Sequence, residues 1–432
     1  MSDRILLVGG GGREDAIARK IIASGSVLYS FMKNRNPSIM RNSREFRIGS
    51  ETEPAAIVKF AEEMKVDLAF IGPDPVLETS LAEDLMKAGI NVASPSRSAA
   101  RIETSKQFMR NLMTENEIPG NIQYRVFNSL EAVSQYLRGN PDVQFAVKPI
   151  GLTGGKGVKV MGIHLADTEQ AVSYASSVIR NDGSVLLEER ITGEEFSLQA
   201  FTDGKNVIPM PIVQDYKMAY EGDTGPNTGG MGSISDSNHL LPFIPSDSGE
   251  KALSILQKVV KAMDSSGNTF RGIMYGQFMN TQQGIKVVEI NARFADPESI
   301  NVLHIFEGDF ARVLHGIADG DLLYRPSFRN SATVLKYIVP VGYGTEPKPS
   351  ALKINASGEM QNSIYYAAVS GDLKSVDQTS SRSLALVGEG KTLNEAYDQS
   401  EAMISSISGN FYVRHDIGSA AMTKRKMEAS RT

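Results

Sequence analysis

Gly151-Leu-Thr-Gly-Gly-Lys-Gly157 and Val287-Val-Glu-Ile-Asn-Ala-Arg293 are the two stretches that decide how this chain is interpreted. In the first, glycines let the backbone adopt positive φ close to phosphate oxygens, and Lys156 adds a positive charge. In the second, Glu289 and Asn291 stand two residues apart on an expected strand, so both side chains project from one face. Carboxylate and amide oxygens suit phosphate-bound magnesium. Together the two stretches predict a site for ATP and a divalent metal, as in an ATP-using ligase.

The expected strand that ends near Arg293 carries further information. Strict alternation places Val288 and Ile290 on the face opposite the metal ligands. Arg293 follows on the ligand face and suits a phosphoryl group in transfer. Gln277, on an expected neighbouring strand, offers an amide oxygen as a third ligand. These oxygen ligands favour magnesium, and manganese as a substitute stays open. A solvent-facing polar row on a half-buried strand is the alternative.

The glycine loop differs from a Walker loop, because Gly157 follows Lys156 where a serine or threonine would stand. We therefore expect a mobile flap over the β- and γ-phosphates, with an ordinary glycine hairpin as the alternative. Lys148 lies in the apolar run Phe145–Lys148, where an unpaired ammonium group would be costly. We expect this lysine to contact phosphate, and a buried salt bridge is the alternative.

Composition excludes several classes of protein. The chain has 432 residues, 41% of them hydrophobic, and no cysteine. This length predicts about three domains, and the missing cysteines exclude disulfides and thiolate chemistry. Five scattered histidines make a catalytic zinc improbable. No apolar run spans a bilayer and no export signal is visible, so we expect a cytoplasmic protein.

Charge gives the expected partners. The formal net charge of −5 provides no general attraction to nucleic acid or to an anionic membrane, so neither is expected as a partner. The basic tail Lys424-Arg-Lys426 is expected to be a solvated end. Small molecules are the expected partners, and monomer and homodimer stay open.

The first hundred residues alternate apolar strands with amphipathic helices, which predicts a doubly wound parallel sheet with both faces covered. The expected strands are 5–8, 67–71 and 90–92, and the expected helices are 13–23 and 76–87. A glycine loop, Gly9–Gly12, joins the first strand to the first helix. Glu14 stands where a dinucleotide fingerprint needs its third glycine, so NAD is disfavoured. A substrate phosphate or hydroxyl, or merely tight packing, would explain this loop.

The rest of the chain divides into two further expected domains. The first, 104–325, begins with a helix over 104–117 and contains a small α+β lobe at about 123–191. That lobe reads as strand, helix, strand, glycine loop, strand, helix, strand. The second, 326–432, has expected strands at 332–340, 364–369 and 384–387 and a helix at 393–405. The doubly wound domain described above is expected to cover residues 1–103. The long loop 223–232 is more typical of a functional segment than of a linker.

Several motifs carry a family resemblance that runs nearly end to end. They are Gly10–Glu14, Lys148 with Gly154–Gly157, Glu188-Glu189, Gly193–Glu195, Gln214–Lys217, Asp223–Gly232, Glu289–Glu298 and Asp416–Gly418. The chain resembles the phosphoribosylamine–glycine ligase family of the ATP-grasp superfamily. The Asp223–Gly232 stretch is the most specific of these motifs, whereas the glycine loop alone points only to the superfamily. The resemblance implies ATP-dependent ligation of glycine to 5-phosphoribosylamine in purine biosynthesis, through a glycyl phosphate.

The resemblance also implies roles for individual residues. Expected to bind ATP are Lys106, Lys148, Gly154, Gly155, Lys156, Gly157, Glu188, Glu189, Ile191 and, at the ribose, Glu195. Expected to bind the other substrates are Gly10, Gly11, Gly12, Arg13, Glu14, Asp215, Lys217, Asp223, Gly225, Pro226, Asn227, Thr228, Gly229 and Asp296. Expected metal ligands are Glu289 and Asn291, with Gln277 from the strand pattern. Arg293, Lys148, Lys217 and Asp215 are the expected catalytic residues.

Departures from the family pattern concern mainly the phosphoribosylamine side. They are Asp15 in place of His, Met218 in place of Arg, Ala295 in place of Gly, Ser419 after Gly418, and the form of Asn34–Pro37. Carboxylate activation is therefore a safer expectation than the identity of the amine. An ATP-grasp ligase of another acid and amine, and a nucleotide-binding or NAD-dependent protein without ATP turnover, are the alternatives.

Overall fold

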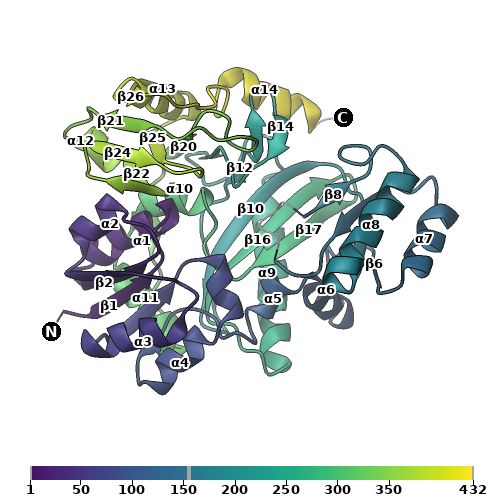
Figure 1. Ribbon diagram of the computed structural model, residues 1–432, viewed down its shortest axis with the longest axis horizontal. Helices are drawn as coiled ribbons and strands as arrows, with labels where there is room; N and C mark the ends of the chain where they lie inside the picture. Colours follow the sequence, from purple (N-terminus) through teal and green to yellow (C-terminus); the bar gives the residue numbers. More distant parts are fainter. Residues whose placement is uncertain (1, 153–156, 431–432) are drawn as a thin grey trace.

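The computed structural model describes residues 2–152 and 157–430. Figure 1 shows the N-terminal domain and a small lobe at opposite ends of the molecule, with a central sheet between them and the C-terminal part above. Among the described residues, no helix combines the length and the apolar character needed to cross a membrane. Expectations for Gly154, Gly155 and Lys156 fall outside the described residues.

The N-terminal domain is the expected doubly wound unit. Its parallel sheet has the order β3-β2-β1-β4-β5. The strands are β1 (Arg4–Val8), β2 (Val27–Met32), β3 (Glu45–Ile48), β4 (Leu68–Ile71) and β5 (Asn91–Val92). The helices are α1 (Gly12–Ala23), α2 (Pro37–Asn42), α3 (Pro54–Glu63), the 3-10 helix η1 (Asp74–Glu78) and α4 (Leu81–Lys87). Ile5 and Leu7 pack into one hydrophobic cluster and Leu6 and Val8 into another, so helices cover both faces.

One expected helix of this domain is interrupted. The apolar pattern over 76–87 predicted a single helix, but the structure has η1 and α4 on either side of Thr79. The Thr79 hydroxyl donates to the carbonyl of Val76 at 2.7 Å and accepts from the amide of Leu81 at 3.3 Å. These local bonds replace helical hydrogen bonds and end the first turn. The gap leaves Asp74 at the start of η1, where it reaches the candidate site.

The small lobe follows the expected order of elements. Its antiparallel sheet has the order β6-β9-β7-β8. The elements are β6 (Tyr124–Phe127), α7 (Leu130–Gly139), β7 (Phe145–Lys148), β8 (Lys159–Val160), α8 (Thr168–Asp182) and β9 (Val185–Glu189). Before it come α5 (Arg101–Thr104) and α6 (Lys106–Glu115). The Ser105 hydroxyl caps α6 by accepting from the amide of Phe108 at 3.2 Å.

The central sheet has the order β11-β10-β16-β17 and lies between the N-terminal domain and the lobe (Figure 1). Its strands are β10 (Glu194–Thr202), β11 (Val207–Pro209), β16 (Gly272–Thr281) and β17 (Gly284–Asn291). Around it lie α9 (Ser248–Ser265), α10 (Glu298–His304), β18 (Phe306–Glu307), α11 (Phe310–Asp319) and β19 (Ser327–Phe328). Gln277 pairs with Glu289, which confirms that their strands are neighbours.

The C-terminal part shares a sheet with the preceding region. Its order, β12-β15-β20-β25-β22, joins strands from both sides of residue 326, where we expected a domain to begin. The strands are β12 (Gln214–Asp215), β15 (Gly232–Ser235), β20 (Ala332–Ile338), β22 (Ile364–Tyr366) and β25 (Leu384–Gly390). The remaining elements are β13 (Met218–Tyr220), β14 (Thr224–Asn227), β21 (Ala351–Ile354), α12 (Glu359–Asn362), β23 (Val369–Gly371), β24 (Ser375–Gln378), α13 (Leu393–Ile404), β26 (Ile407–Gly409) and α14 (Ala420–Ala429).

Arg110 joins the lobe to the central sheet. This fully buried side chain on α6 donates to Glu188 of β9 at 2.8 Å and to the carbonyls of Val287 and Val288 at 2.9 Å. A second bond from Lys148 reaches the other oxygen of Glu188 at 2.6 Å. Burial alone would raise the pKa of Glu188, but the charges of Arg110 and Lys148 outweigh it and lower that pKa to about 2. The buried carboxylate is therefore ionised and fully paired.

Replacing Arg110 by methionine should destabilise the protein, because it leaves the buried charge of Glu188 with one partner fewer. We expect the free energy of unfolding in urea to fall by about 3–5 kcal/mol. Arg138→Met is the matched control, since Arg138 pairs with Glu169 where both side chains are more than half exposed. That control should change the free energy of unfolding far less, because water screens an exposed ion pair. Equal losses in the two variants would contradict a special role for Arg110.

Candidate functional site

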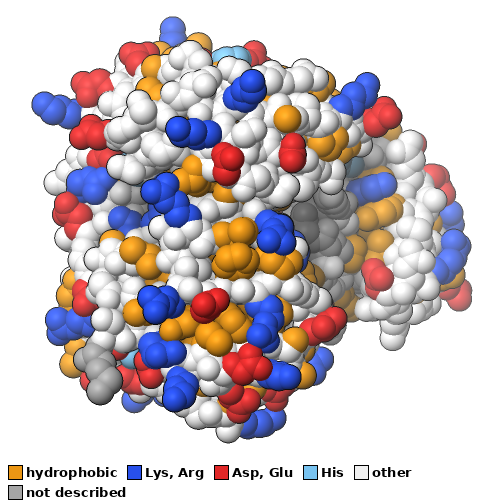
Figure 2. All heavy atoms as spheres, turned by 60° about the vertical axis from the view of Figure 1, so that its left-hand side comes forward, with side chains coloured by type: hydrophobic (Ala, Val, Ile, Leu, Met, Phe, Trp, Pro, Cys, Tyr) orange, Lys and Arg blue, Asp and Glu red, His pale blue; other side chains and the backbone are white. Residues whose placement is uncertain are grey.

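A cleft of about 780 Å³ lies where the lobe, the central sheet, the N-terminal domain and the C-terminal part meet. Figure 2 shows the surface hollowed between the lobe and the larger body. The predicted residues that line it are Arg13, Lys106, Lys148, Glu188, Glu189, Ile191, Glu195, Asp215, Lys217, Asn227, Thr228, Gly229, Glu289, Asn291, Arg293 and Asp296. Segments far apart in the sequence thus converge on one cavity.

Other predicted residues do not line this cleft. Among the described residues, these are Gly10, Gly11, Gly12, Glu14, Gly157, Asp223, Gly225, Pro226 and Gln277. The glycine loop at the start of α1 is closely packed: a Cβ on Gly12 would come within 2.5 Å of the Tyr337 hydroxyl. The amide of Gly11 already donates to Glu14 at 2.8 Å. Tight packing, the alternative kept open for this loop, accounts for its glycines.

One wall of the cleft is cationic. Lys148 reaches it from β7 while paired with Glu188, so the buried salt bridge that we had kept as an alternative exists within the cleft wall. Lys106 stands at the start of α6, and its ammonium group donates to the carbonyl of Gly151 at 2.9 Å. Burial lowers the pKa of Lys106, with the charge of Glu289 opposing that change. Two lysines from different elements therefore face the same cavity.

The two side chains expected to bind metal, Glu289 and Asn291, lie on β17. The Asn291 amide nitrogen is 3.2 Å from a Glu289 oxygen, so the two side chains adjoin as alternation predicted. Burial opposes ionisation of Glu289, but the charge of Lys217 and the bond from Asn291 lower its pKa. No group of three or more His, Asp and Glu side chains in residues 2–152 and 157–430 is arranged to hold a metal alone. The pair fits a cation that takes its remaining oxygens from phosphate and water.

One expectation for these strands needs correction, and the metal-ligand role of Gln277 stays a prediction. A β-bulge shifts the register so that Gln277 opposes Glu289 while Phe278 opposes Val287, which leaves Val288 unpaired. Val288 and Ile290 both line the cleft, whereas strict alternation placed them on the opposite face. The amide oxygen of Gln277 accepts a hydrogen bond from the Tyr275 hydroxyl, and its nitrogen donates to Glu195 at 2.9 Å. The expectation that Gln277 binds metal finds no support in this arrangement.

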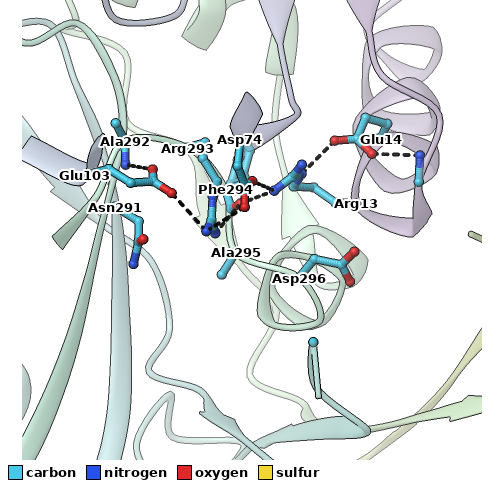
Figure 3. A network of polar contacts seen from close by, with 12 residues as sticks. Arg13, Glu14, Asp74, Glu103, Asn291, Ala292, Arg293, Phe294, Ala295 and Asp296 are labelled. Atoms are coloured by element: carbon cyan, nitrogen blue, oxygen red, sulfur yellow. Dashed lines mark hydrogen bonds and ion pairs between the residues drawn. The ribbon is translucent and has the colours of Figure 1, made fainter. Parts of the chain in front are cut away.

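Arg293 is held by two acidic side chains that sequence analysis missed (Figure 3). Its guanidinium lies 2.8 Å from Asp74 of η1 and 3.1 Å from Glu103 of α5. Burial raises the pKa of Glu103 to about 7, although the charge of Arg293 opposes that shift. Arg13 joins the same network, 3.3 Å from Asp74 and 2.6 Å from Glu14. The N-terminal domain thus orients the arginine expected to meet the transferred phosphate.

Two further acidic side chains, Asp215 and Glu298, line the cleft. Burial raises the pKa of Asp215 well above its usual range, and the negative charge of Glu298 adds to the shift. Burial also raises the pKa of Glu298, which accepts a bond from the Tyr275 hydroxyl at 3.0 Å. The Asp215 Oδ1 atom is buried and accepts no hydrogen bond from any described residue. Lys217 is nearby and pairs with Glu195 at 3.1 Å.

The C-terminal part also reaches the cleft. Arg382 lies 3.0 Å from Asp296 and donates to the backbone carbonyl of the same residue at 2.8 Å. Its position next to Asp296 in the cleft wall had no sequence signal, because it lies far from every recognisable motif. Asp15, a departure from the family pattern, accepts from the amide of Tyr366 at 2.9 Å and pairs with Arg19 at 2.9 Å. It links α1 to β22 and lies outside the cleft lining.

Comparison with known proteins gives one family over most of the chain. Residues 3–103 match the family described as phosphoribosylglycinamide synthetase, N domain, and residues 104–299 match its ATP-grasp (A) domain. The phosphoribosylamine–glycine ligase of Methanoregula boonei is 47% identical, covering 98% of each chain. That of Pyrococcus horikoshii is 44% identical, covering 98% of this chain and 97% of the relative.

Solved structures show the same fold. The crystal structure of a phosphoribosylamine–glycine ligase from Thermotoga maritima superposes with a TM-score of 0.81 at 24% identity, covering 96% of this chain and all of the other. The biotin carboxylase domain of Hydrogenobacter thermophilus 2-oxoglutarate carboxylase, solved with MgADP, gives 0.74 at 15% identity and covers 100% of this chain and 94% of that domain. On these matches, the chain belongs to the phosphoribosylglycinamide synthetase family.

Proposed function

We propose that the protein joins glycine to 5-phosphoribosylamine with cleavage of ATP to ADP and phosphate, a step of purine biosynthesis. The observation that carries this proposal is the meeting of Lys106 and Lys148 with Glu289 and Asn291 in one cleft, in a chain of this family. Small molecules are the partners, and a cytoplasmic location suits substrates that are all water-soluble. The division into 1–103, 104–325 and 326–432 stays a proposal.

The first chemical step is phosphorylation of the glycine carboxylate. A carboxylate oxygen attacks the γ-phosphorus of ATP, the bond to the bridging oxygen breaks, and ADP leaves. Both reactants are negatively charged, so Lys106 and Lys148 lower the repulsion on the ATP side. Arg293, fixed by Asp74 and Glu103, offers its guanidinium to the phosphoryl group in transfer. These residues position and neutralise, and no nucleophilic side chain is needed.

The second step forms the amide bond. The amine nitrogen of phosphoribosylamine attacks the carbonyl carbon of glycyl phosphate, the bond from that carbon to the phosphate oxygen breaks, and phosphate leaves. The nitrogen loses one proton as the amide forms, and this proton leaves with the phosphate as hydrogen phosphate. The contact of Lys217 with Glu195 and the hydrogen bonds between Thr228 and Lys217 keep this side of the cleft in place. Asn227, Thr228 and Gly229 line the cleft there.

ATP-grasp proteins use ATP with a divalent metal, and we propose magnesium for this chain. Glu289 and Asn291 would hold it, with manganese as a substitute that suits the same oxygens. The metal supplies positive charge that screens the phosphates during transfer. The lowered pKa of Glu289 supports this assignment, because the carboxylate is ionised without any need for a metal.

Asp215 and Glu298 are the groups that we assign to the ammonium group of glycine. An unpartnered carboxylate oxygen inside a cavity is costly unless a ligand compensates it. Asp215 Oδ1 is buried without a hydrogen-bond donor among the described residues, Asp215 and Glu298 both line the cleft, and Glu298 is close enough to raise the pKa of Asp215. A cation between them would relieve their mutual repulsion. Glycine carries that cation next to the carboxylate to be activated.

Substrate omission tests the proposed reaction. ADP release, followed with a coupled assay, should require ATP, magnesium, glycine and freshly generated phosphoribosylamine together. Release that continues without glycine would point to an ATP-grasp ligase of another acid. If the complete mixture gave no ATP turnover, the result would favour a nucleotide-binding protein without catalytic activity.

Glu289→Gln should slow turnover strongly, because the variant keeps the shape of the side chain but loses its charge at the metal. We expect a rate loss of about a hundredfold, equivalent to roughly 3 kcal/mol. A higher magnesium concentration should be needed for half-maximal rate. Glu250→Gln on the exposed side of α9 is the control and should leave the rate unchanged. A normal rate in Glu289→Gln would remove Glu289 from the site.

The pH dependence of glycine use should reflect the raised pKa values of Asp215 and Glu298. Protonation removes the negative charge that holds the ammonium group, so kcat/KM for glycine should fall as pH drops through those raised values. Glu298→Gln removes a like charge from Asp215 and should move this acid limb to lower pH, besides weakening glycine binding. Glu346→Gln, at an exposed position, should leave the limb in place. An unmoved limb in Glu298→Gln would contradict the assignment.

A further inference from the structure

Strands β13 and β14 form a hairpin whose base lies at the cleft wall. Lys217 stands just before β13, while Asn227 ends β14 and Thr228 follows it. The amide and the hydroxyl of Thr228 both donate to the carbonyl of Lys217 at 2.8 Å, which closes the base of the hairpin. The base lines the cleft, and the tip around Gly222 and Asp223 does not. Movement of the tip would therefore be transmitted to groups at the base.

The tip is held by the C-terminal segment. Asp223 has a left-handed backbone with φ of 58°, which costs energy for a residue other than glycine. Its carboxylate pairs with Arg414 at 3.0 Å and with Arg425 of α14 at 2.6 Å. Arg425 also donates to the carbonyl of Gly222 at 3.1 Å. These contacts fix the strained residue from outside the hairpin.

A second contact of α14 reaches the strand beside the cleft. Lys426 lies 3.1 Å from Glu194, the residue before Glu195 at the start of β10. The Lys426 side chain is only 13% exposed and lies near the rings of Tyr216 and Phe243. Glu195 in turn pairs with Lys217 in the cleft. One helix thus holds both the hairpin tip and the start of β10.

This arrangement contradicts the expectation of a solvated basic tail. Figure 1 shows α14 lying beside β14 at the top of the molecule. Of the three basic residues, Lys424 alone fits that expectation, since its side chain is 78% exposed and its described ion pair, 3.9 Å long, is with Glu428 of the same helix. Arg425 and Lys426 point toward the hairpin and β10. The charges of the tail therefore have specific partners.

We propose that Arg425 and Lys426 are positioning residues for the reaction: through Asp223 and Glu194 they set the places of Lys217, Glu195 and Thr228 on the substrate side of the cleft. The inference rests on the proposed function for its substrates. Small displacements of such groups lower the efficiency of a reaction that depends on orientation. The cationic wall at Lys148 belongs to other elements and has no contact with α14 among the hydrogen bonds and ion pairs of the described residues.

Steady-state kinetics of Arg425→Ala, Lys426→Met and the double variant test this inference. Each single variant should raise KM for glycine or phosphoribosylamine about threefold to tenfold, the range expected for losing one partly exposed ion pair. The double variant should exceed both, while KM for ATP stays within about twofold of the wild type in Arg425→Ala, whose contacts do not include the neighbour of Glu195, the residue expected at the ATP ribose. Arg425→Lys and Lys426→Arg should recover much of the loss. Lys424→Ala is the matched control on the same helix and should behave as the wild type.

A double-mutant cycle separates positioning from direct substrate binding by Asp223. If Asp223 acts in part through Arg425, Asp223→Asn should raise the same KM values in the wild type and have a smaller effect in Arg425→Ala, where only its contact with Arg414 is left to lose. Unchanged KM values in both α14 variants, with lowered thermal stability alone, would overturn the inference. A full additional effect of Asp223→Asn in Arg425→Ala would overturn it as well. Failure of the proposed function is distinguishable, because the wild type and Lys424→Ala would then also show no glycine-dependent turnover.

Discussion

The contact between Lys148 and Glu188, completed by Arg110, is the interaction on which the cleft depends. An ammonium group in an apolar strand must be paired, and Glu188 of the neighbouring strand supplies the partner at 2.6 Å. Arg110 balances the second oxygen of Glu188 and also holds the carbonyls of Val287 and Val288. The bonds that compensate the buried charge therefore join the cationic wall of the lobe to β17, the strand of the proposed metal ligands Glu289 and Asn291.

Much of the fold could be predicted because its local patterns are unambiguous. The apolar run 5–8 ahead of an amphipathic helix predicted a parallel sheet, and the order of elements in the lobe emerged as expected. Other features depend on contacts that no local pattern encodes. The bulge at Val288 is a single unpaired residue, and alternation cannot reveal it. Ser233 of β15 pairs with Leu335 of β20. The proposed domain boundary at residue 326 therefore separates strands that belong to one sheet.

The candidate site shows the same division between local and long-range information. Lys148 and Glu289 could be found because each lies in a strand where its charge is unexpected. Asp74, Glu103 and Arg382 were missed, since each resembles an ordinary surface charge until the fold brings it to the cleft. One departure from the family pattern lies outside the cleft. Asp15 accepts a hydrogen bond from the amide of Tyr366 and joins two parts of the molecule.

A crystal structure with a non-hydrolysable ATP analogue and magnesium is the most direct test of the central claim, that both walls of the cleft serve one triphosphate. The account predicts phosphate oxygens within hydrogen-bond distance of the Lys148 ammonium group, and a metal that contacts Glu289, Asn291 and those same phosphates. An analogue bound away from this cleft would contradict the account. So would a complex in which Lys148 and Glu289 contact different ligands.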